Sequence, residues 1–258
     1  MTIKLRKTVI VLILALATVF VMSSCGSDKP EVTVFAAASL AEVLQPLGEQ
    51  FESEQGIEVK FSFGGSWTLA QQVSRGAPAD VFLAAGPGPM DSLDEYGLLA
   101  PGSRIDLLAN VLVIVGTDPR DAVVFTPEDL LRDDVSRVAL SDPVLAPAGN
   151  YAREALQNLN IWDDVQSKLV YGLNVRTALQ YVSSGNADLA IVYATDAASD
   201  DTLRPLWWFP PETHSPIRYP VTALRDAENP SLATEFLSFL VSEEASSVFM
   251  EHGFTPIK

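Results

Sequence analysis

The stretch VTVFAAASLAEVLQPLGEQF, residues 32–51, contains the pattern that decides the fold. It begins with a short β-rich run, Val32 to Ala36, and continues with a helical spacing of apolar residues from Leu40 through Phe51. Ser39 lies at the junction between the two. A strand that leads into a helix through one small polar residue is typical of sheets whose parallel strands are joined by crossover helices.

The same unit recurs along the chain. Apolar spacing predicts strands at 57–63, 80–84, 107–115, 137–140, 188–193, 203–209 and 217–224, and helices at 66–73, 90–96, 151–159, 162–169, 175–184 and 231–251, with a further helix start at 126–128. This alternation predicts an α/β fold with mainly parallel sheets. The long apolar run 107–115 is of the kind that can cross between two lobes.

The predicted crossings divide the body into two lobes. We expect lobe 1 to comprise residues 32–106 and 219–258, and lobe 2 to comprise residues 107–218. Ligands of such sheets bind at the carboxyl ends of the strands, so the cleft between the lobes is the expected site. Two crossing segments would also make a hinge.

The N-terminus is typical of an export signal. Lys4, Arg6 and Lys7 precede an uncharged apolar run that ends in Met22-Ser23-Ser24-Cys25-Gly26, which resembles a bacterial lipoprotein cleavage box. We expect residues 1–24 to be a signal peptide, Cys25 to be acylated and 25–31 to be a tether. The protein would be exported and anchored to a membrane, facing the periplasm or the extracellular side. A plain signal peptide or an uncleaved anchor is the alternative.

The charge and the cysteine content argue against a nucleic-acid partner and exclude a disulfide within the chain. The chain carries a net charge of −16 and has no basic stripe, so nucleic acid is not an expected partner. Cys25 is the only cysteine, so no disulfide can form within the chain. An anionic ligand is still possible in an acidic protein if local dipoles, rather than cationic side chains, bind it.

Four predicted junctions between a strand and a helix place small or hydroxyl residues where a helix begins. A helix N-terminus has unsatisfied N–H groups and a partial positive charge, which together bind anions. A serine at such a position is more often only a cap for its own helix, so no junction is informative alone. The four junctions are Ala38-Ser39-Leu40, Gly65-Ser66, Pro147-Ala148-Gly149 and Asn174-Val175.

Several segments together resemble the periplasmic molybdate-binding proteins. The resemblance extends from about Glu31 to the C-terminus, and the combination of segments is highly specific. Trp67 departs from the family pattern, which usually has a small residue there, and could lie over the mouth of the cleft. The matching segments are 35–40 (FAAASL), 63–66 (FGGS), 69–72 (LAQQ), 76–82 (GAPADVF), 142–143 (DP), 147–149 (PAG), 151–152 (YA), 174–176 (NVR) and 191–197 (IVYATDA).

The resemblance implies a type II periplasmic-binding-protein fold, with a mixed, mostly parallel sheet in each lobe and a two-strand hinge. It also implies a monomer that binds molybdate, and tungstate as well, and delivers it to an ABC permease without catalysis or a cofactor. Each implied ligand group is a neutral donor, and no cation site is involved. The implied groups are the hydroxyl and N–H of Ser39 and Ser66, the N–H of Ala148 and Val175, and the phenol of Tyr193.

Two alternatives remain open from the sequence. The same fold could bind another tetrahedral oxyanion such as sulfate. A secreted serine hydrolase is a more remote possibility, because neither serine lies in a G-x-S-x-G motif. His214 and His252 are far apart in sequence and show neither a catalytic motif nor metal-ligand spacing. Arg176, next to Val175, is expected to point away from the N–H donors.

Overall fold

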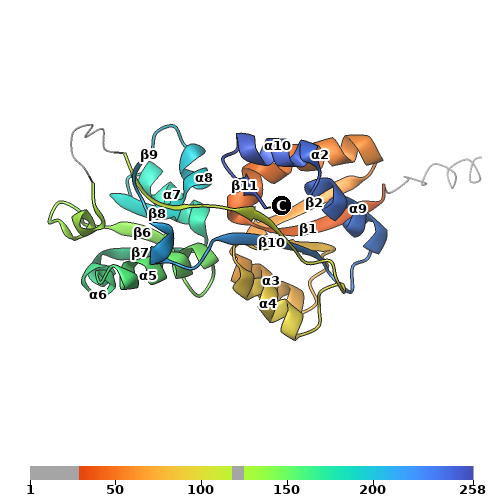
Figure 1. Ribbon diagram of the computed structural model, residues 1–258, viewed down its shortest axis with the longest axis horizontal. Helices are drawn as coiled ribbons and strands as arrows, with labels where there is room; N and C mark the ends of the chain where they lie inside the picture. The colour runs from red at the N-terminus through yellow and green to blue at the C-terminus, as the bar shows by residue number, and fades with distance from the viewer. Residues whose placement is uncertain (1–28, 118–124, 258) are drawn as a thin grey trace, which may run out of the picture. The chain divides into compact units, whose positions relative to one another are not determined.

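The computed structural model describes residues 29–117 and 125–257. From Glu31 onward the described chain forms one compact body (Figure 1). The predicted signal peptide 1–24, the acylation site Cys25 and residues 26–28 of the tether lie outside the described residues, so they stay predictions. Within the part of the chain that is described, no helix is both long enough and apolar enough to cross a membrane.

The first sheet has six strands in the order β11-β4-β10-β3-β1-β2. The strand β1 pairs in parallel with β2 and β3, whereas β10 is antiparallel to β3 and β4, and β11 is antiparallel to β4. The bounds are β1 (Glu31–Ala37), β2 (Glu58–Gly64), β3 (Val81–Leu83), β4 (Ile105–Ala109), β10 (Arg218–Ala223) and β11 (Thr255–Pro256).

The second sheet has five strands in the order β7-β6-β8-β5-β9. Here β6 is parallel to β7 and β8, and β5 is antiparallel to β8 and β9. Both sheets are mixed, as predicted, but antiparallel pairing is more extensive than the strand and helix alternation indicated. The bounds are β5 (Leu112–Gly116), β6 (Val138–Ser141), β7 (Leu169–Gly172), β8 (Leu189–Tyr193) and β9 (Arg204–Trp208).

Helices cover both faces of each sheet. In Figure 1, α2, α9 and α10 lie on one side of the first sheet and α3 and α4 on the other, while α7 and α8 lie across the second sheet from α5 and α6. The helices are η1 (Ala38–Leu40), α2 (Ala41–Gln55), α3 (Ser66–Ser74), α4 (Pro87–Glu95), η2 (Pro127–Leu131), α5 (Pro147–Asn158), α6 (Trp162–Val165), η3 (Gln166–Lys168), α7 (Val175–Ser183), α8 (Ala194–Ala198), η4 (Pro211–Thr213), α9 (Pro230–Leu240) and α10 (Glu243–Glu251).

The chain passes between the sheets twice, at Asn110-Val111 and through residues 209–217. The prediction of one continuous strand over 107–115 is therefore wrong. Residues Ile105–Ala109 pair within the first sheet and Leu112–Gly116 within the second. Between them the Asn110 side chain accepts a hydrogen bond from the Val111 N–H, which satisfies that backbone group without a strand partner.

Two other segments differ from the predicted elements. The predicted helix 162–169 ends at Lys168, because Leu169–Gly172 forms the edge strand β7 beside β6. The predicted closing helix 231–251 is two helices, and Ser242 caps the second by accepting a bond from the Ala245 N–H at 3.1 Å. Neither change moves the residues of the predicted site.

The proposed division into two lobes stays a prediction. Below we call the parts built on the first and second sheets the first and second halves.

Candidate functional site

One small pocket brings together all five residues predicted to bind the ligand. Ser39 follows β1 in η1, and Ser66 is the first residue of α3. The other three come from the second half: the second residue of α5, the first residue of α7 and the last residue of β8 are Ala148, Val175 and Tyr193. Donors far apart in the sequence thus converge from both halves, and their role in binding stays a prediction.

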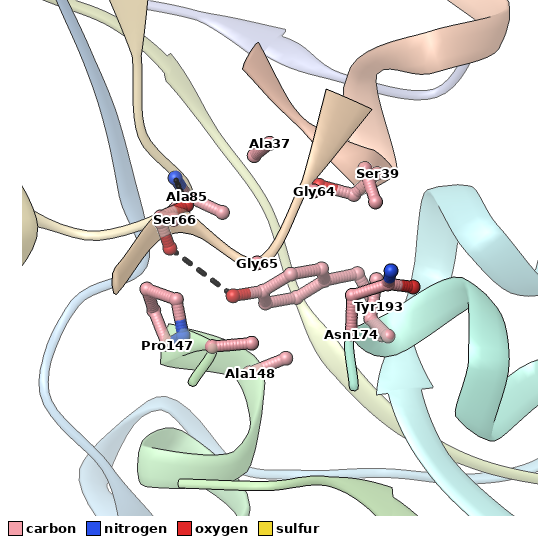
Figure 2. A pocket seen from close by; sticks show the side chains of 13 residues that line it. Ala37, Ser39, Gly64, Gly65, Ser66, Ala85, Pro147, Ala148, Asn174 and Tyr193 are labelled. Carbon is pink, nitrogen blue, oxygen red and sulfur yellow. Dashed lines mark hydrogen bonds between the residues drawn. The ribbon is translucent and has the colours of Figure 1, made fainter. Parts of the chain in front are cut away.

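The pocket is narrow and carries no charged side chain. Its empty volume is about 200 Å³, part of which is open to solvent, so an occupant must be small. Figure 2 shows the Tyr193 ring lying across the pocket, with Ser66 and Ala85 near its hydroxyl end. The lining residues are Ala37, Ala38, Ser39, Gly64, Gly65, Ser66, Ala85, Ala146, Pro147, Ala148, Asn174, Val175 and Tyr193.

The two serines are buried, and the hydroxyl of each makes a hydrogen bond within the protein. Ser66 is 1% exposed and its Oγ accepts from the Ala85 N–H at 3.0 Å. The Ser66 proton is therefore not used by this contact, since a hydroxyl that accepts can still donate. Ser39 is 3% exposed, and its Oγ lies 3.2 Å from the Tyr219 hydroxyl.

Tyr193 is fully buried, and its hydroxyl donates to the carbonyl oxygen of Ala85 at 3.1 Å. Burial raises the pKa of this phenol well above its usual value, so the group is neutral. The sequence predicted that the phenol donates to the ligand. In the structure its single proton is already used by Ala85, so donation to a ligand requires the hydroxyl to rotate.

Two helices of the second half point their N-terminal amides at the pocket. Ala148 and Val175 lie in the first turns of α5 and α7, where an amide has no acceptor within its own helix. Asn174 caps α7 by accepting from the Thr177 N–H at 3.0 Å, which leaves the preceding amides for other partners. These dipoles give the uncharged pocket a positive potential.

Arg176 does not line the pocket, in agreement with the expected direction of its side chain. Its Nη1 lies 2.7 Å from a carboxylate oxygen of Glu42 and 2.6 Å from Ser199 Oγ, and its Nε lies 2.8 Å from Oδ1 of Asp196. Glu42 belongs to α2 in the first half, and Asp196 to α8 in the second. The guanidinium therefore links the two halves just beside the pocket.

Asp196 is unusual because it is completely buried. Burial raises the pKa of this carboxyl to about 7, although the nearby Arg176 charge favours the ionised form. The contact with Arg176 is close but poorly aligned, so both carboxylate oxygens lack a well-formed hydrogen bond. The ion pair holds Arg176 in place, although burial disfavours the charged form of Asp196.

Glycines allow the two halves to approach closely at the pocket. A Cβ atom on Gly65 would lie 2.5 Å from the Leu145 carbonyl oxygen and 3.0 Å from that of Leu173. The backbone N–H of Trp67, two residues further along the chain, donates to the same Leu145 oxygen at 3.1 Å. The Trp67 side chain itself does not line the pocket but lies against Gly88.

The sequence did not single out Ala85, and it placed Gly65 and Asn174 at helix-start junctions without assigning them to the ligand; all three line the pocket. Ala85 contributes its backbone N–H to Ser66 and its carbonyl to Tyr193, and a backbone role leaves no mark on residue type. Its place directly after the predicted strand 80–84 was the available signal, because loops at the carboxyl ends of strands form such sites. Asn174 was recognisable as a helix cap.

Comparison with known proteins adds to this geometry. The family described as bacterial extracellular solute-binding protein matches residues 32–255. The chain is 34% identical over 254 residues to the Bacillus subtilis protein YvgL, whose name describes an ABC transporter substrate-binding lipoprotein, with 95% of this chain and 97% of that protein aligned. It is 37% identical over 235 residues to the molybdate-binding protein ModA of Escherichia coli, with coverages of 89% and 90%. The periplasmic molybdate-binding protein of Azotobacter vinelandii superimposes with a TM-score of 0.79 at 26% identity, covering 88% of this chain and 100% of that one.

Proposed function

Because this chain belongs to the family of bacterial extracellular solute-binding proteins, we propose that it binds molybdate and delivers it to an ABC permease for uptake. The observation that carries the proposal is the convergence of Ser39, Ser66, Ala148, Val175 and Tyr193 on one small uncharged pocket. Tungstate, which has the same shape and charge, is expected to bind as well.

A set of neutral donors suits a tetrahedral dianion. Burial of a dianion without a counter-ion is costly, but each hydrogen bond to a charged group contributes about 1.5 to 3 kcal/mol. Two hydroxyls, several first-turn amides and the helix dipoles behind them can together offset that cost. The small cavity favours an oxyanion over a sugar, an amino acid or a peptide.

The division of the body supports closure around the ligand. We propose that the two halves act as lobes, residues 32–109 with 218–258 as lobe 1 and 112–208 as lobe 2, and that Asn110-Val111 and the segment 209–217 between them act as the hinge. Ligand binding would then favour the arrangement in which both sets of donors meet. The docked partner would be a permease, and the protein itself a monomer.

We further propose that the mature protein begins at an acylated Cys25 and is tethered to the membrane on the outer side of the cell. The support is the sequence around Cys25 and the lipoprotein name of the B. subtilis relative. Mass spectrometry of the protein purified from membranes, with Cys25→Ala as the control, measures the lipid directly.

The test of the ligand is calorimetry of the purified protein with molybdate, tungstate, sulfate and phosphate. We expect molybdate and tungstate to bind at micromolar concentration or below and to raise the melting temperature, whereas sulfate and phosphate bind much more weakly. The double variant Ser39→Ala plus Ser66→Ala should lose most of the affinity. Strong sulfate binding with weak molybdate binding would assign the site to the alternative anion.

The pocket gives no support to a hydrolase. The family consists of solute-binding proteins, and none of the residues lining the pocket is a histidine or a carboxylate that could act as a general base. The nitrogen Nδ1 of His214 is hydrogen-bonded to the Ser215 carbonyl, and that of His252 to the Val248 carbonyl. These observations support a role for Ser39 and Ser66 as binding groups and give no support to a role as nucleophiles.

A further inference from the structure

A row of buried and half-buried polar side chains connects the first passage between the sheets to the pocket. Asn110, which lies between β4 and β5, donates through Nδ2 to the Tyr219 hydroxyl at 3.1 Å and to the Thr195 hydroxyl at 2.9 Å. The Tyr219 hydroxyl in turn lies 3.2 Å from Ser39 Oγ. We call Asn110, Tyr219 and Ser39 the hinge relay.

The direction of the hydrogen bonds in the hinge relay follows from Asn110. Its Oδ1 accepts from the Val111 N–H at 2.8 Å, and because a backbone N–H can only donate, this contact identifies the oxygen of the amide. The other amide atom is then the nitrogen, which donates and cannot accept. The Tyr219 oxygen must therefore accept from Asn110, and its own proton is left for Ser39.

Burial keeps that proton on Tyr219. The side chain is 1% exposed, and burial raises the pKa of the phenol well above its usual value, with the charge of Asp196 raising it further. The phenol is therefore neutral and able to donate at any physiological pH. Ser39 Oγ, 3.2 Å from the Tyr219 hydroxyl, is an acceptor within reach of this proton.

The direction of the Ser39 hydrogen follows from its contact with Tyr219. Its Oγ accepts from Tyr219, so its own hydrogen is directed away from Tyr219, and Ser39 lines the pocket. Ser66 is arranged in the same way, because its Oγ accepts from the Ala85 N–H. We propose that Tyr219, oriented by Asn110, is a positioning residue that makes Ser39 a hydrogen-bond donor toward the bound anion. This inference rests on the proposed function.

The hinge relay also bears on selectivity. A fully deprotonated oxyanion offers only acceptors, which match a site in which both serines are held as donors. An oxyanion that carries a proton would place an O–H against a donor, and the unmatched group would cost it affinity. Because Asn110 lies where the chain changes sheet, the same contacts link the orientation of Ser39 to the arrangement of the two halves.

The experiment is a double-mutant cycle on the full chain with molybdate as the ligand, measured by calorimetry. The variants are Tyr219→Phe, Ser39→Ala and the two combined. Each single substitution removes one hydroxyl oxygen and adds no charge. We expect Tyr219→Phe to lower the affinity about five- to tenfold when Ser39 is present and less than about twofold in the Ser39→Ala background. Such non-additivity is the signature of a residue that acts through Ser39.

Tyr151→Phe is the matched control. Tyr151 is also a buried tyrosine next to Tyr193, but within the described part of the chain its hydroxyl makes no hydrogen bond to a predicted ligand residue. We expect this variant to bind molybdate as the wild type does. If Tyr219→Phe does not fold, the cycle of Asn110→Ala with Ser39→Ala replaces it and should show the same non-additivity.

The outcomes distinguish the two proposals. Additive effects of Tyr219→Phe and Ser39→Ala, in a protein that binds molybdate tightly, would overturn the hinge relay and leave the proposed function standing. An unchanged affinity in Tyr219→Phe would do the same. A wild-type protein that binds none of the oxyanions would remove both proposals together.

Discussion

Substitution of one glycine should prevent the two halves from meeting while leaving every predicted donor in place. Gly65 has a φ of −66°, which alanine adopts without strain, so the backbone of a Gly65→Ala variant needs no change. Its new Cβ would lie 2.5 Å from the Leu145 carbonyl oxygen and 3.0 Å from that of Leu173. Both oxygens belong to the second half, so the steric conflict exists only when the halves are together.

The size of the effect follows from these distances. Ordinary contacts of a Cβ atom begin near 3.4 Å, so the second half must retreat by about 0.4 to 0.9 Å from the position it has in the structure. Overpacking of this kind costs about 1 to 3 kcal/mol. Since 1.4 kcal/mol is a factor of ten, the dissociation constant for molybdate should rise by roughly 5- to 150-fold.

Gly48→Ala is the matched control. Its Cβ would also come within 2.5 Å of another atom, but that atom belongs to the Phe61 ring, which lies in the same half. We expect this variant to change the melting temperature without changing the affinity, and Gly65→Ala to change the affinity without a comparable change in stability. Calorimetry and stopped-flow dissociation measure the affinity, and thermal unfolding measures the stability. Wild-type affinity in Gly65→Ala would refute the inference that binding requires the observed approach of the halves.

Three further predictions concern the charged and phenolic groups. The Glu42→Gln variant should speed molybdate dissociation only a few-fold, because the ion pair with Arg176 is partly exposed. The difference from wild type should shrink in 0.5 M salt. An effect that salt does not reduce would argue against a role for this ion pair. The pKa of Asp196 is raised to about 7, so the folded state retains a proton that the unfolded state loses, and this group's stabilisation is lost as the pH rises from about 4 to 7. Denaturation across that range should therefore show a more negative pH slope in wild type than in Asp196→Asn, and parallel slopes would contradict the assignment. Tyr193→Phe should weaken molybdate binding less than Ser66→Ala, because its proton already has an acceptor in the protein; a larger loss in calorimetry would show that the hydroxyl turns to the anion.

The sequence predicted the positions of the donors better than their hydrogen bonds. Ser39, Ser66 and Val175 lie at helix starts, and a helix start is a local feature that apolar spacing and a small residue reveal. Their convergence on one pocket could be expected only through the family resemblance, since the spacing says nothing about which junctions face one another. The partner of Tyr193 is a backbone carbonyl, which no residue type signals.

Two of the errors in the predicted fold have a common cause. Residues 107–115 are apolar except for Asn110, and local spacing cannot show that this residue is where the strand partners change from one sheet to the other. Leu169 was assigned to the end of a helix because the preceding residues are helical, whereas the pairing of Leu169–Gly172 with β6 is a long-range contact. Both errors concern strand pairing, which depends on residues far away in the sequence.

The strongly acidic composition and the proposed anionic ligand are compatible because the nearby cation is already neutralised. Arg176 follows directly after Val175, yet its guanidinium contacts Asp196 and Glu42 and does not line the pocket. Attraction of the anion must then come from amides and hydroxyls at short range, which salt screens weakly because the contacts are buried. Affinity carried by these dipoles should persist at high ionic strength, while the link between Arg176 and Glu42 weakens. The charged residues would thus adjust how the halves meet, and the uncharged pocket would decide which anion is bound.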